Sequence, residues 1–345
     1  MSYQRDFDIR VSVAMVGGGS HAYRNLLPAM NFLPVDLKAI CVKSDMVRAE
    51  RTAAQYGCRA YTDRDRMFTE VDFDAVVVCL PPAIQAEVGA EILDRGKHVW
   101  LEKPPGLTGS EVEKLIEKRG DRIAMVGFKK AFMPVTDKAR EICSSAAYSG
   151  LNSMLALYPI RIIRSEVSRN ERGEPAAWMV SGVHPVSFLL AVGGKAVSVR
   201  TVCGQTGYGL CCIRFESGVI GNIHLASGAS PMETYCLYGD GWHLEIYNNI
   251  RVSLHRGVPL KYGRSTSFVP SGEDSGAVVW EAANSQARLE NKALFTQGIY
   301  GALKEFFDCV IENRRPRCGS LEFALDVMRV CEAAMRSDGS EVMLH

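Results

Sequence analysis

Apolar runs and helical patterns alternate through the first third of the chain. The run VSVAMV (11–16) is short and β-branched, and three glycines (17–19) follow it at once, which is typical of a buried strand that enters a tight turn. Residues 25–30 can continue as a helix, residues 37–42 form a second apolar run, and residues 44–57 have helical periodicity that ends at a glycine. The order is strand, helix, strand, helix.

The same alternation continues to about residue 130. The predicted elements are a strand over 73–80, a helix over 83–95, and strands over 98–103 and 123–128. Between the last two strands, SEVEKLIEKRG predicts a helix with Ser110 as N-cap and Glu113 closing a capping box. Such alternation indicates a parallel sheet covered on both faces, so residues 1–130 are expected to form a doubly wound α/β domain.

Beyond residue 130 the pattern changes. A helix over 135–143 is followed by alternating apolar and polar positions with turn signals at hairpin-like spacing, which predicts one largely antiparallel, open sheet. Two helices, about 286–313 and 321–336, close the chain. Residues 131–345 are therefore expected to form an α+β domain for substrate binding and oligomerisation.

Composition narrows the class of partner. The chain has 345 residues, of which 47% are hydrophobic and 23% charged, and its formal net charge is +1. These values favour a folded protein with a small-molecule partner over one that binds nucleic acid. The polar start MSYQRDFDIR and the lack of an apolar run of about 18 residues favour a cytoplasmic location without membrane contact.

Cysteine and histidine usage gives no metal prediction. The 11 cysteines include no CxxC pair, and the 7 histidines include no HxH or HxxxH pair. Buried free thiols in a reducing compartment, with neither a disulfide framework nor a zinc site, are the simplest interpretation.

The first strand and its glycines carry a dinucleotide fingerprint. Gly17-x-Gly19-x-x-Ala22 matches G-x-G-x-x-G/A directly after a predicted strand and before a predicted helix. Gly17 permits the tight turn, Gly19 admits the pyrophosphate, and the next residues, Ser20 and His21, begin the helix whose free N–H groups face the phosphates. The alternative is an ordinary turn in an α/β protein that binds another ligand.

The end of the second strand bears on the choice between NAD and NADP. An acidic residue there binds the ribose 2′-OH, whereas a basic or small polar pair admits a 2′-phosphate. Lys43 and Ser44 occupy the expected place, with Arg48 nearby, so NADP is favoured. The alternative is that these side chains are solvated and Asp45 serves NAD after a shift of one residue.

Four motifs together resemble one family. The glycine turn, VVVCLPP (76–82), GKHVWLEKP (96–104) and MVGFKKAF (125–132) are similar to those of the Gfo/Idh/MocA family of glucose-fructose oxidoreductases, myo-inositol dehydrogenases and rhizopine-catabolism proteins. The resemblance covers residues 1–145 well. It is looser beyond, where it rests on SGVHPVSFLLAVGG (181–194) and NKALFTQGIYGALKEF (291–306).

The resemblance implies a nicotinamide-dependent oxidoreductase in which Lys103 lies beside the nicotinamide and the reacting carbon. An ammonium group there can polarise a carbonyl oxygen or relay a proton. The family's Asp-x-x-x-His motif places its histidine at His184, as a second catalytic group, but its carboxylate position is Val180 in this chain. The alternatives are a surface lysine and a core histidine.

Further candidates follow from the same motifs. Lys129 stands where relatives have an arginine-containing motif and is expected to contact cofactor or substrate. Arg161 and its neighbours Arg164, Arg169 and Arg172 would favour an acidic or phosphorylated sugar, and Trp178 would stack on a sugar ring. The predicted cofactor contacts comprise Gly17, Gly19, Ser20, His21, Ala22, Lys43, Ser44, Arg48, Leu80, Pro81, Glu102, Lys103 and Lys129.

The expected function is hydride transfer between NADP or NAD and a hydroxyl or keto carbon of a sugar, a cyclitol or a sugar derivative. Two alternatives belong to other classes. One is a catalytically silent protein that senses NAD(P) or a metabolite, which the valine at position 180 makes credible. The other is a lyase or hydrolase that uses tightly bound NAD transiently. A homodimer or homotetramer is expected, because one face of the second sheet needs cover.

Overall fold

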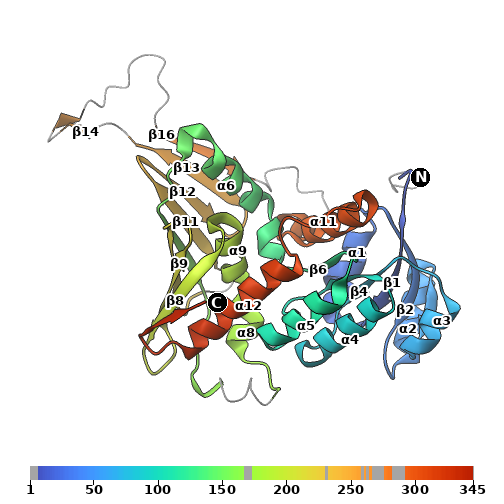
Figure 1. Cartoon of the computed structure of the whole chain (residues 1–345). Helices are drawn as coiled ribbons and strands as arrows, with labels where there is room; N and C mark the ends of the chain where they lie inside the picture. Colours follow the sequence, from blue (N-terminus) through green and yellow to red (C-terminus); the bar gives the residue numbers. More distant parts are fainter. Residues whose placement is uncertain are drawn as a thin grey trace.

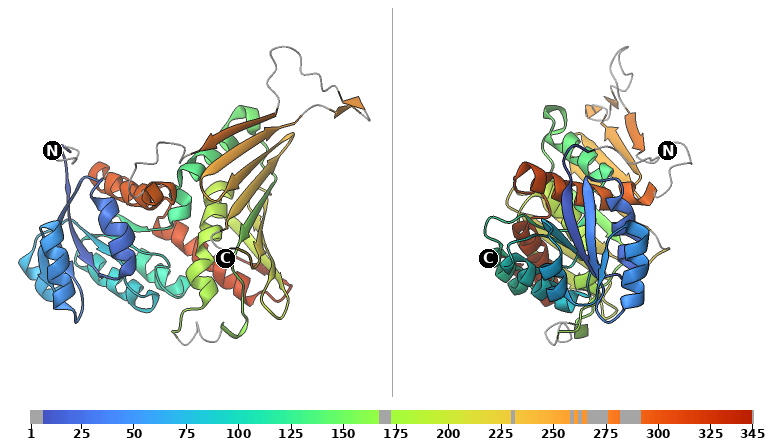
Figure 2. Two further views of the ribbon diagram at one scale, coloured as in Figure 1. Left: turned by 180° about the vertical axis from the view of Figure 1, so that it is seen from behind. Right: turned by 90° about the vertical axis from the view of Figure 1, so that its right-hand side faces the viewer.

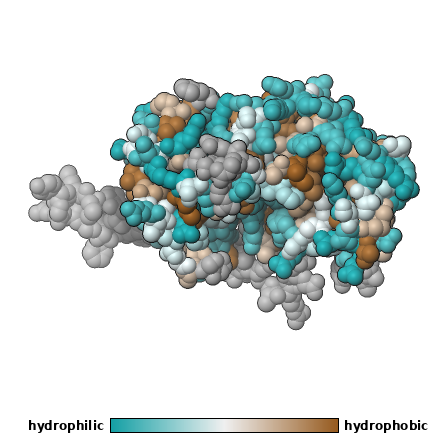
Figure 3. Space-filling model, turned by 90° about the horizontal axis from the view of Figure 1, so that it is seen from below, coloured by the Kyte–Doolittle hydropathy of each residue, from teal (hydrophilic) through white to brown (hydrophobic). Residues whose placement is uncertain are grey.

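Two sheets organise the molecule. The computed structural model describes residues 7–166, 173–229, 232–257, 260–261, 264–265, 276–281 and 292–344. A six-stranded sheet forms the N-terminal half and a nine-stranded sheet the C-terminal half (Figure 1). None of the described helices is both long enough and apolar enough to span a bilayer. Figure 3 shows a mainly hydrophilic lower face with scattered apolar residues.

The first sheet is parallel throughout and has the order β3-β2-β1-β4-β5-β6. Successive residues of β1 face opposite layers, because Ala14 and Val16 pack in one apolar cluster and Val13 and Met15 in another. The doubly wound α/β fold predicted for this half is thus confirmed. Its strands are β1 (Val11–Val16), β2 (Val35–Cys41), β3 (Arg59–Tyr61), β4 (Ala75–Val78), β5 (His98–Leu101) and β6 (Ala124–Val126).

Helices follow the strands as the alternation predicts. The turn after β1 leads into a π-helical turn rather than directly into α-helix. The helical elements of this half are the π-helical turn Ala22–Leu26, α1 (Leu27–Met30), α2 (Met46–Tyr56), α3 (Arg64–Glu70), α4 (Pro82–Asp94) and α5 (Gly109–Arg119).

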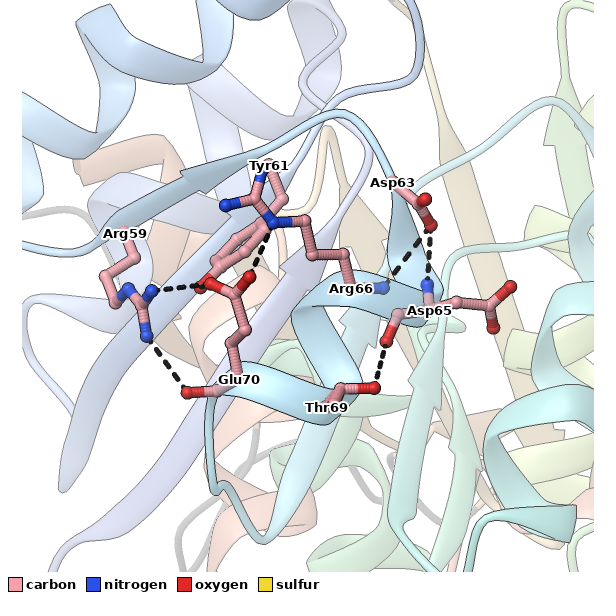
Figure 4. Close-up of polar contacts among 7 residues, drawn as sticks. All are labelled: Arg59, Tyr61, Asp63, Asp65, Arg66, Thr69 and Glu70. Carbon is pink, nitrogen blue, oxygen red and sulfur yellow. Dashed lines mark hydrogen bonds and ion pairs between the residues drawn. The ribbon is translucent and has the colours of Figure 1, made fainter.

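Sequence analysis missed β3 and α3. The strand has three residues, of which only Tyr61 is buried, so no apolar run marks it. Side-chain contacts hold this unit (Figure 4): Asp63 Oδ1 accepts from the N–H of Asp65 at 2.8 Å, and Glu70 Oε2 accepts from Arg59 Nη2 at 2.7 Å and from the Tyr61 hydroxyl at 3.1 Å. Polar contacts of this kind leave no periodic signal.

The predicted cap of α5 was wrong. Thr108 is the N-cap, with φ −137° and ψ 158°, and Glu111 completes the capping box. Ser110 lies inside the helix, and Glu113 instead accepts from Arg329 Nη2 at 2.8 Å. Two overlapping box patterns exist in this segment, and extended backbone at Thr108 selects the earlier one.

The second sheet is antiparallel except for the parallel pair β7 and β10, as predicted. Three helices, α6 (Pro134–Ser144), α9 (Val183–Gly193) and α12 (Leu321–Arg336), cover one face (Figure 2). The shorter α8 (Ala177–Ser181) precedes α9. The strands are β7 (Ser153–Tyr158), β8 (Ala196–Cys203), β9 (Gly209–Phe215), β10 (Ile220–Leu225), β11 (Thr234–Gly239), β12 (Trp242–Tyr247), β13 (Arg251–Arg256), β16 (Gly276–Glu281) and β17 (Glu341–Met343).

The helical turn Lys129–Phe132 joins the halves, and a second turn, Ala146–Tyr148, connects α6 to β7. β14 (Leu260–Lys261) pairs with β15 (Arg264–Ser265) in a separate ribbon. The single helix predicted over 286–313 was wrong. Residues 286–291 lie outside the described residues, and the rest forms α10 (Lys292–Thr296) and α11 (Ile299–Glu312). A left-handed glycine, Gly298 at φ 81°, separates the two helices.

The chain returns to its first half near the C-terminus. Leu303 and Phe306 of α11 share an apolar cluster with Met15 of β1 and Trp100 of β5. The domain boundary at 130/131 stays a prediction. The packing of α11 on β1 and β5 shows that a segment from beyond this boundary covers the first sheet.

Candidate active site

The glycine turn after β1 has room above it. Gly17 has φ 103°, and a Cβ there would lie 2.1 Å from the Cys79 carbonyl oxygen. At Gly19, by contrast, a Cβ would meet no atom within 4 Å. The Gly19 carbonyl accepts from the Tyr23 N–H at 3.2 Å, so the helical turn begins here. Gly17 thus permits the close turn, and the free space at Gly19 lets a dinucleotide pyrophosphate approach the backbone.

A cleft of about 810 Å³ lies beside the carboxyl ends of β1 and β2, with Val16 and Cys41 on its wall, and its volume suits a nucleoside. Lys43 and Ser44 lie on its wall, and Ser44 adopts φ 62°. In the part of the chain that the structure describes, Lys43 forms no ion pair. The other residues of the wall are Val16, Cys41, Met46, Thr62, Asp63, Arg64, Asp65, Leu80, Ile84, Glu91 and Arg95.

Asp45 and Arg48 do not line this cleft. Asp45 Oδ1 caps α2 by accepting from the Arg48 N–H at 2.9 Å, and its Oδ2 lies 3.1 Å from Arg48 Nε. Arg48 Nη1 also donates to the Gly18 carbonyl at 3.3 Å. The carboxylate of Asp45 is therefore occupied by the N-cap hydrogen bond of α2 and by the ion pair with Arg48.

The lysine of the Glu-Lys-Pro loop lies at the carboxyl edge of β5. Its Nζ donates to the Val180 carbonyl at 3.3 Å, which ties this loop to α8. Gln85, fully buried in α4, holds this loop by hydrogen bonds. Its Nε2 donates to the carbonyls of Pro104, at 2.8 Å, and of Glu102. Its Oε1 accepts from the Leu80 N–H at 3.1 Å. The peptide between Lys103 and Pro104 is cis.

Glu102 connects the lysine loop to the glycine turn. Its Oε2 accepts from the Lys103 N–H at 2.6 Å, and its Oε1 lies 2.9 Å from His21 Nε2. That spacing makes an ion pair when the imidazole is protonated, although the ring nitrogen is not aligned for a hydrogen bond. His21 Nδ1 lies 3.1 Å from Asn25 Nδ2. Two motifs, represented by residues that are 81 positions apart, thus meet through a carboxylate and an imidazole.

His184 lies at the start of α9 and is buried. Its Nδ1 is enclosed and has no hydrogen-bond partner among the described residues. Burial, together with the ammonium groups of Lys103 and Lys129, holds the pKa of this imidazole well below 6.5. The ring is therefore neutral at pH 7, and the orienting carboxylate that the family motif would supply is replaced by the aliphatic side chain of Val180.

Two consecutive lysines follow β6. Lys129 Nζ donates to Gln297 Oε1 at 2.8 Å, and Lys130, which is fully buried, forms an ion pair with Glu233. Glu233 Oε2 also accepts from the Tyr235 hydroxyl at 3.3 Å. Burial, and then the charges of Lys130 and Lys103, lower the pKa of Lys129 to about 8.

Comparison with known proteins agrees with this geometry. Residues 11–128 match the family described as "Oxidoreductase family, NAD-binding Rossmann fold" under the name GFO_IDH_MocA. Through these residues the first third of the chain is similar to the NAD-binding part of the Gfo/Idh/MocA family. The resemblance predicted from the motifs is confirmed.

Two curated proteins and one solved structure are similar to this chain. A dTDP-3,4-didehydro-2,6-dideoxy-alpha-D-glucose 3-reductase of Saccharopolyspora spinosa is 37% identical over 31% of this chain, a match that covers only 32% of the reductase. A 4-carboxy-2-hydroxymuconate-6-semialdehyde dehydrogenase of Sphingobium is 23% identical over 66% of this chain and 75% of its own. Levoglucosan dehydrogenase, solved with NADH and levoglucosan, shares the fold, with TM-score 0.78, 16% identity, and coverage of 97% of this chain and 99% of the other.

The other predicted substrate contacts lie in different surroundings. Trp178 is fully buried and donates from Nε1 to the Cys331 carbonyl at 3.0 Å, so it packs in the core and presents no face to a sugar. Arg161 stacks over Tyr208 at 5.9 Å and lines a separate cleft. Arg164 donates to the Ser337 carbonyl at 3.2 Å, and Arg169 and Arg172 lie outside the described residues.

Several residues of the site gave no sequence signal. Glu233 and Gln297 reach the two lysines from loops far along the chain, and Tyr158 at the end of β7 lies with its ring 6.3 Å from that of His184. Gln85 reaches the Glu-Lys-Pro loop, 17 positions along the chain at Glu102. Local patterns assign no role to these residues, because the contacts with the lysines, His184 and Glu102 join distant segments.

Proposed function

We propose that this protein is an NAD(P)-dependent oxidoreductase that transfers a hydride between the nicotinamide and a hydroxyl or keto carbon of a sugar, a cyclitol or a sugar derivative. The observation that carries the proposal is the arrangement of Lys103. Its loop is braced by Gln85 and joined through Glu102 to a glycine turn with open space above Gly19. A cofactor on that turn extends toward the strand edge at which Lys103 lies.

Each residue has a chemical role in this proposal. A bound nicotinamide supplies the hydride acceptor for oxidation or the hydride donor for reduction. Lys103 holds the substrate oxygen through its ammonium group, stabilises negative charge on it, and takes or gives the proton. Neutral His184 offers a ring nitrogen as a hydrogen-bond partner, at a position where Lys103 and Lys129 disfavour its protonation.

NADP is the favoured cofactor. Lys43 and Ser44 line the cleft where the adenosine ribose belongs, whereas Asp45 is occupied by the cap of α2 and by Arg48. A 2′-phosphate can form an ion pair with the ammonium group of Lys43, whereas a neutral 2′-OH cannot.

Titration with NADPH and NADH, followed by nicotinamide fluorescence, tests both the oxidoreductase assignment and the choice of NADP. We expect tighter binding of NADPH, and reversal of this preference in the Lys43→Glu variant, with Lys38→Glu as a control on the exposed edge of β2. Preference for NADH in the unaltered protein would refute the choice of NADP only. Binding of neither cofactor to a folded protein without retained nucleotide would refute the oxidoreductase.

A carbohydrate-like substrate is proposed from the relatives. The Saccharopolyspora relative is named for a deoxysugar and the structural neighbour for levoglucosan, whereas the Sphingobium relative is named for a muconate semialdehyde. The polar side chains of the site, among them Gln297 and the Tyr235 hydroxyl, agree with a polyhydroxylated substrate.

A catalytically silent NAD(P) or metabolite sensor is the second candidate, favoured by the unpartnered Nδ1 of His184 and by Val180. Nucleotide binding without turnover on a panel of sugars, polyols and sugar acids supports it. A lyase or hydrolase would instead retain NAD through purification, because its redox-neutral cycle needs no cofactor exchange.

We also propose a cytoplasmic homodimer or homotetramer. The face of the nine-stranded sheet that the helices leave open carries exposed apolar side chains, which self-association would cover. Size-exclusion chromatography with light scattering checks this, and a monomer would contradict it. The exposed residues are Val202, Leu210, Tyr238, Tyr247 and Val279.

A further inference from the structure

Positive charge exceeds negative charge at the junction of the two halves. Three lysines, at positions 103, 129 and 130, lie near His184 and each opposes its protonation. The nearby carboxylates are Glu102 and Glu233. A buried group of like charges costs free energy unless counter-charges balance it.

Both carboxylates are already engaged. Glu233 forms the ion pair with Lys130 and accepts from the Tyr235 hydroxyl. Glu102 faces His21 and the N–H of Lys103. Across the described residues, neither Lys103 Nζ nor Lys129 Nζ has a carboxylate within 4.0 Å; their partners are the neutral oxygens of Val180 and Gln297. Two ammonium groups therefore lack counter-ions.

The two unbalanced lysines have different access to the substrate. Lys103 belongs to the proposed catalytic loop, where its role is to hold the reacting oxygen. Lys129 is held by Gln297, which leaves two of its three N–H donors for a further acceptor. Burial and the neighbouring lysines lower its pKa to about 8, because the surrounding protein stabilises the ammonium group less than water does.

We propose that the substrate carries a carboxylate and that Lys129 binds it, so that the enzyme acts on polyhydroxylated carboxylic acids such as sugar acids rather than on neutral sugars. This inference rests on the proposed oxidoreductase function. A carboxylate fits better than a phosphate ester, because doubly charged phosphates favour bidentate arginines. The arginines predicted for such a role, Arg161 and Arg164, contact the Tyr208 ring and the Ser337 carbonyl.

The test uses the full chain saturated with NADPH or NADP and probes of matched shape: D-glucuronate and D-gluconate, D-glucose and myo-inositol, and D-glucose 6-phosphate. Calorimetry gives affinity, and nicotinamide absorbance gives turnover. We expect an acid to bind at least about tenfold more tightly than its neutral counterpart, with affinity falling as pH rises above about 8 and Lys129 loses its proton.

Variants locate the effect. Lys129→Met, in which methionine has nearly the same shape as lysine, is expected to weaken acid binding by roughly 10- to 100-fold and to weaken neutral-sugar binding far less, because only the acid offers a carboxylate to the lost ammonium group. Lys129→Arg keeps the charge and restores part of the acid affinity. Lys38→Met, on the exposed edge of β2, is the control and changes neither.

Several outcomes would overturn the inference. They are equal or better binding of neutral sugars, preference for the phosphate ester, no binding of any acid, or acid binding that Lys129→Met leaves intact. If NADP(H) binds and neutral sugars are oxidised, the oxidoreductase stands and only the acid is refuted. If neither cofactor binds, the proposed function itself fails.

A second inference comes from the open face of the nine-stranded sheet. The register of β12 and β13 sets His243 opposite His255, with their rings 4.4 Å apart and nearly parallel. Glu245 lies two residues along the same strand, and its two oxygens are 3.8 Å from Nε2 of each histidine. One ligand atom from each side chain lies within 4.8 Å of the others, and the His255 Nε2 is enclosed without a hydrogen-bond partner among described residues.

We infer that these three side chains form a site for a divalent transition metal such as Zn²⁺, with a fourth position that they leave unfilled. Two imidazoles and one carboxylate are a ligand set that zinc accepts. The sequence prediction of no metal site depended on short spacings such as HxH, and a cross-strand pair 12 residues apart escapes that search.

Metal analysis after incubation with Zn²⁺ and desalting tests this site. We expect about one zinc per chain, lost in His255→Asn and Glu245→Gln and kept in His224→Asn, an exposed histidine on β10. Because the chain has 11 cysteines that can also take up metal, Co²⁺ spectra are needed: bands without thiolate charge transfer support the site. Absence of bound zinc, or uptake that the variants do not change, overturns it.

Discussion

The glycine turn and the lysine junction of this molecule are assembled in different ways. All parts of the turn lie within residues 11–22. A buried strand is followed by Gly17, where a side chain would clash with Cys79, and by Gly19, where a Cβ would meet no atom within 4 Å. The junction collects Lys103, Lys129, His184 and Gln297 from four separate elements, and long-range contacts hold it. Cofactor binding should therefore depend on local backbone geometry, whereas catalysis should depend on the packing of the two halves.

The largest expected effect concerns the junction. Lys103→Met is expected to lower kcat by roughly 10² or more, because an acid/base and electrostatic group is lost. NADPH affinity, measured by fluorescence, is expected to stay nearly unchanged. Unaltered turnover would remove Lys103 from the mechanism, and a parallel loss of cofactor affinity would show that the two regions are not separable.

The glycine turn can be tested with a matched pair of variants. Gly19→Ala meets no protein atom within 4 Å, so we expect an unchanged melting temperature without cofactor and at least about tenfold weaker NADPH binding. Gly17→Ala would set a Cβ 2.1 Å from the Cys79 carbonyl at φ 103°, so it should destabilise the fold by about 2 kcal/mol or more. Equal melting temperatures would contradict this division of roles.

Gln85 links the two regions, and its loss should produce an intermediate effect. Gln85→Leu leaves the Leu80 N–H and the Glu102 carbonyl without their side-chain partner, at a cost of about 1–3 kcal/mol. Because Gln85 is a positioning residue, kcat should fall more than NADPH affinity. Gln85→Glu, which keeps one acceptor, should recover part of kcat. A loss of stability with kcat unchanged would make the role purely structural.

The smallest effect concerns the pH dependence of stability. Burial lowers the pKa of His184 below 6.5. Below that pH the imidazole is protonated in the unfolded chain but stays neutral in the folded protein until its lowered pKa is reached. This residue should cost no stability above pH 6.5, and up to about 1.4 kcal/mol per pH unit as pH falls below it. His184→Asn should flatten the fall in melting temperature between neutral and mildly acidic pH. An identical slope in the variant would show that other groups dominate.

Local patterns were enough to predict most of the first sheet. The strands near residues 11, 37, 75, 98 and 124 are buried apolar runs, and the helices between them carry periodic apolar faces. The failures were β3, with one buried residue, and the α5 cap, where two box patterns overlap. Both depend on contacts that short-range periodicity does not encode.

The sequence by itself determined the fold class, the glycine turn and the position of Lys103, because each follows from neighbouring residues and backbone conformation. The tertiary structure decided which side chains surround that lysine. Burial of Trp178, the partnership of Lys130 with Glu233, and the lack of a carboxylate at Lys129 depend on how distant segments pack. Electrostatic interactions act through space, so the charge balance of the site appears only when the two halves are assembled.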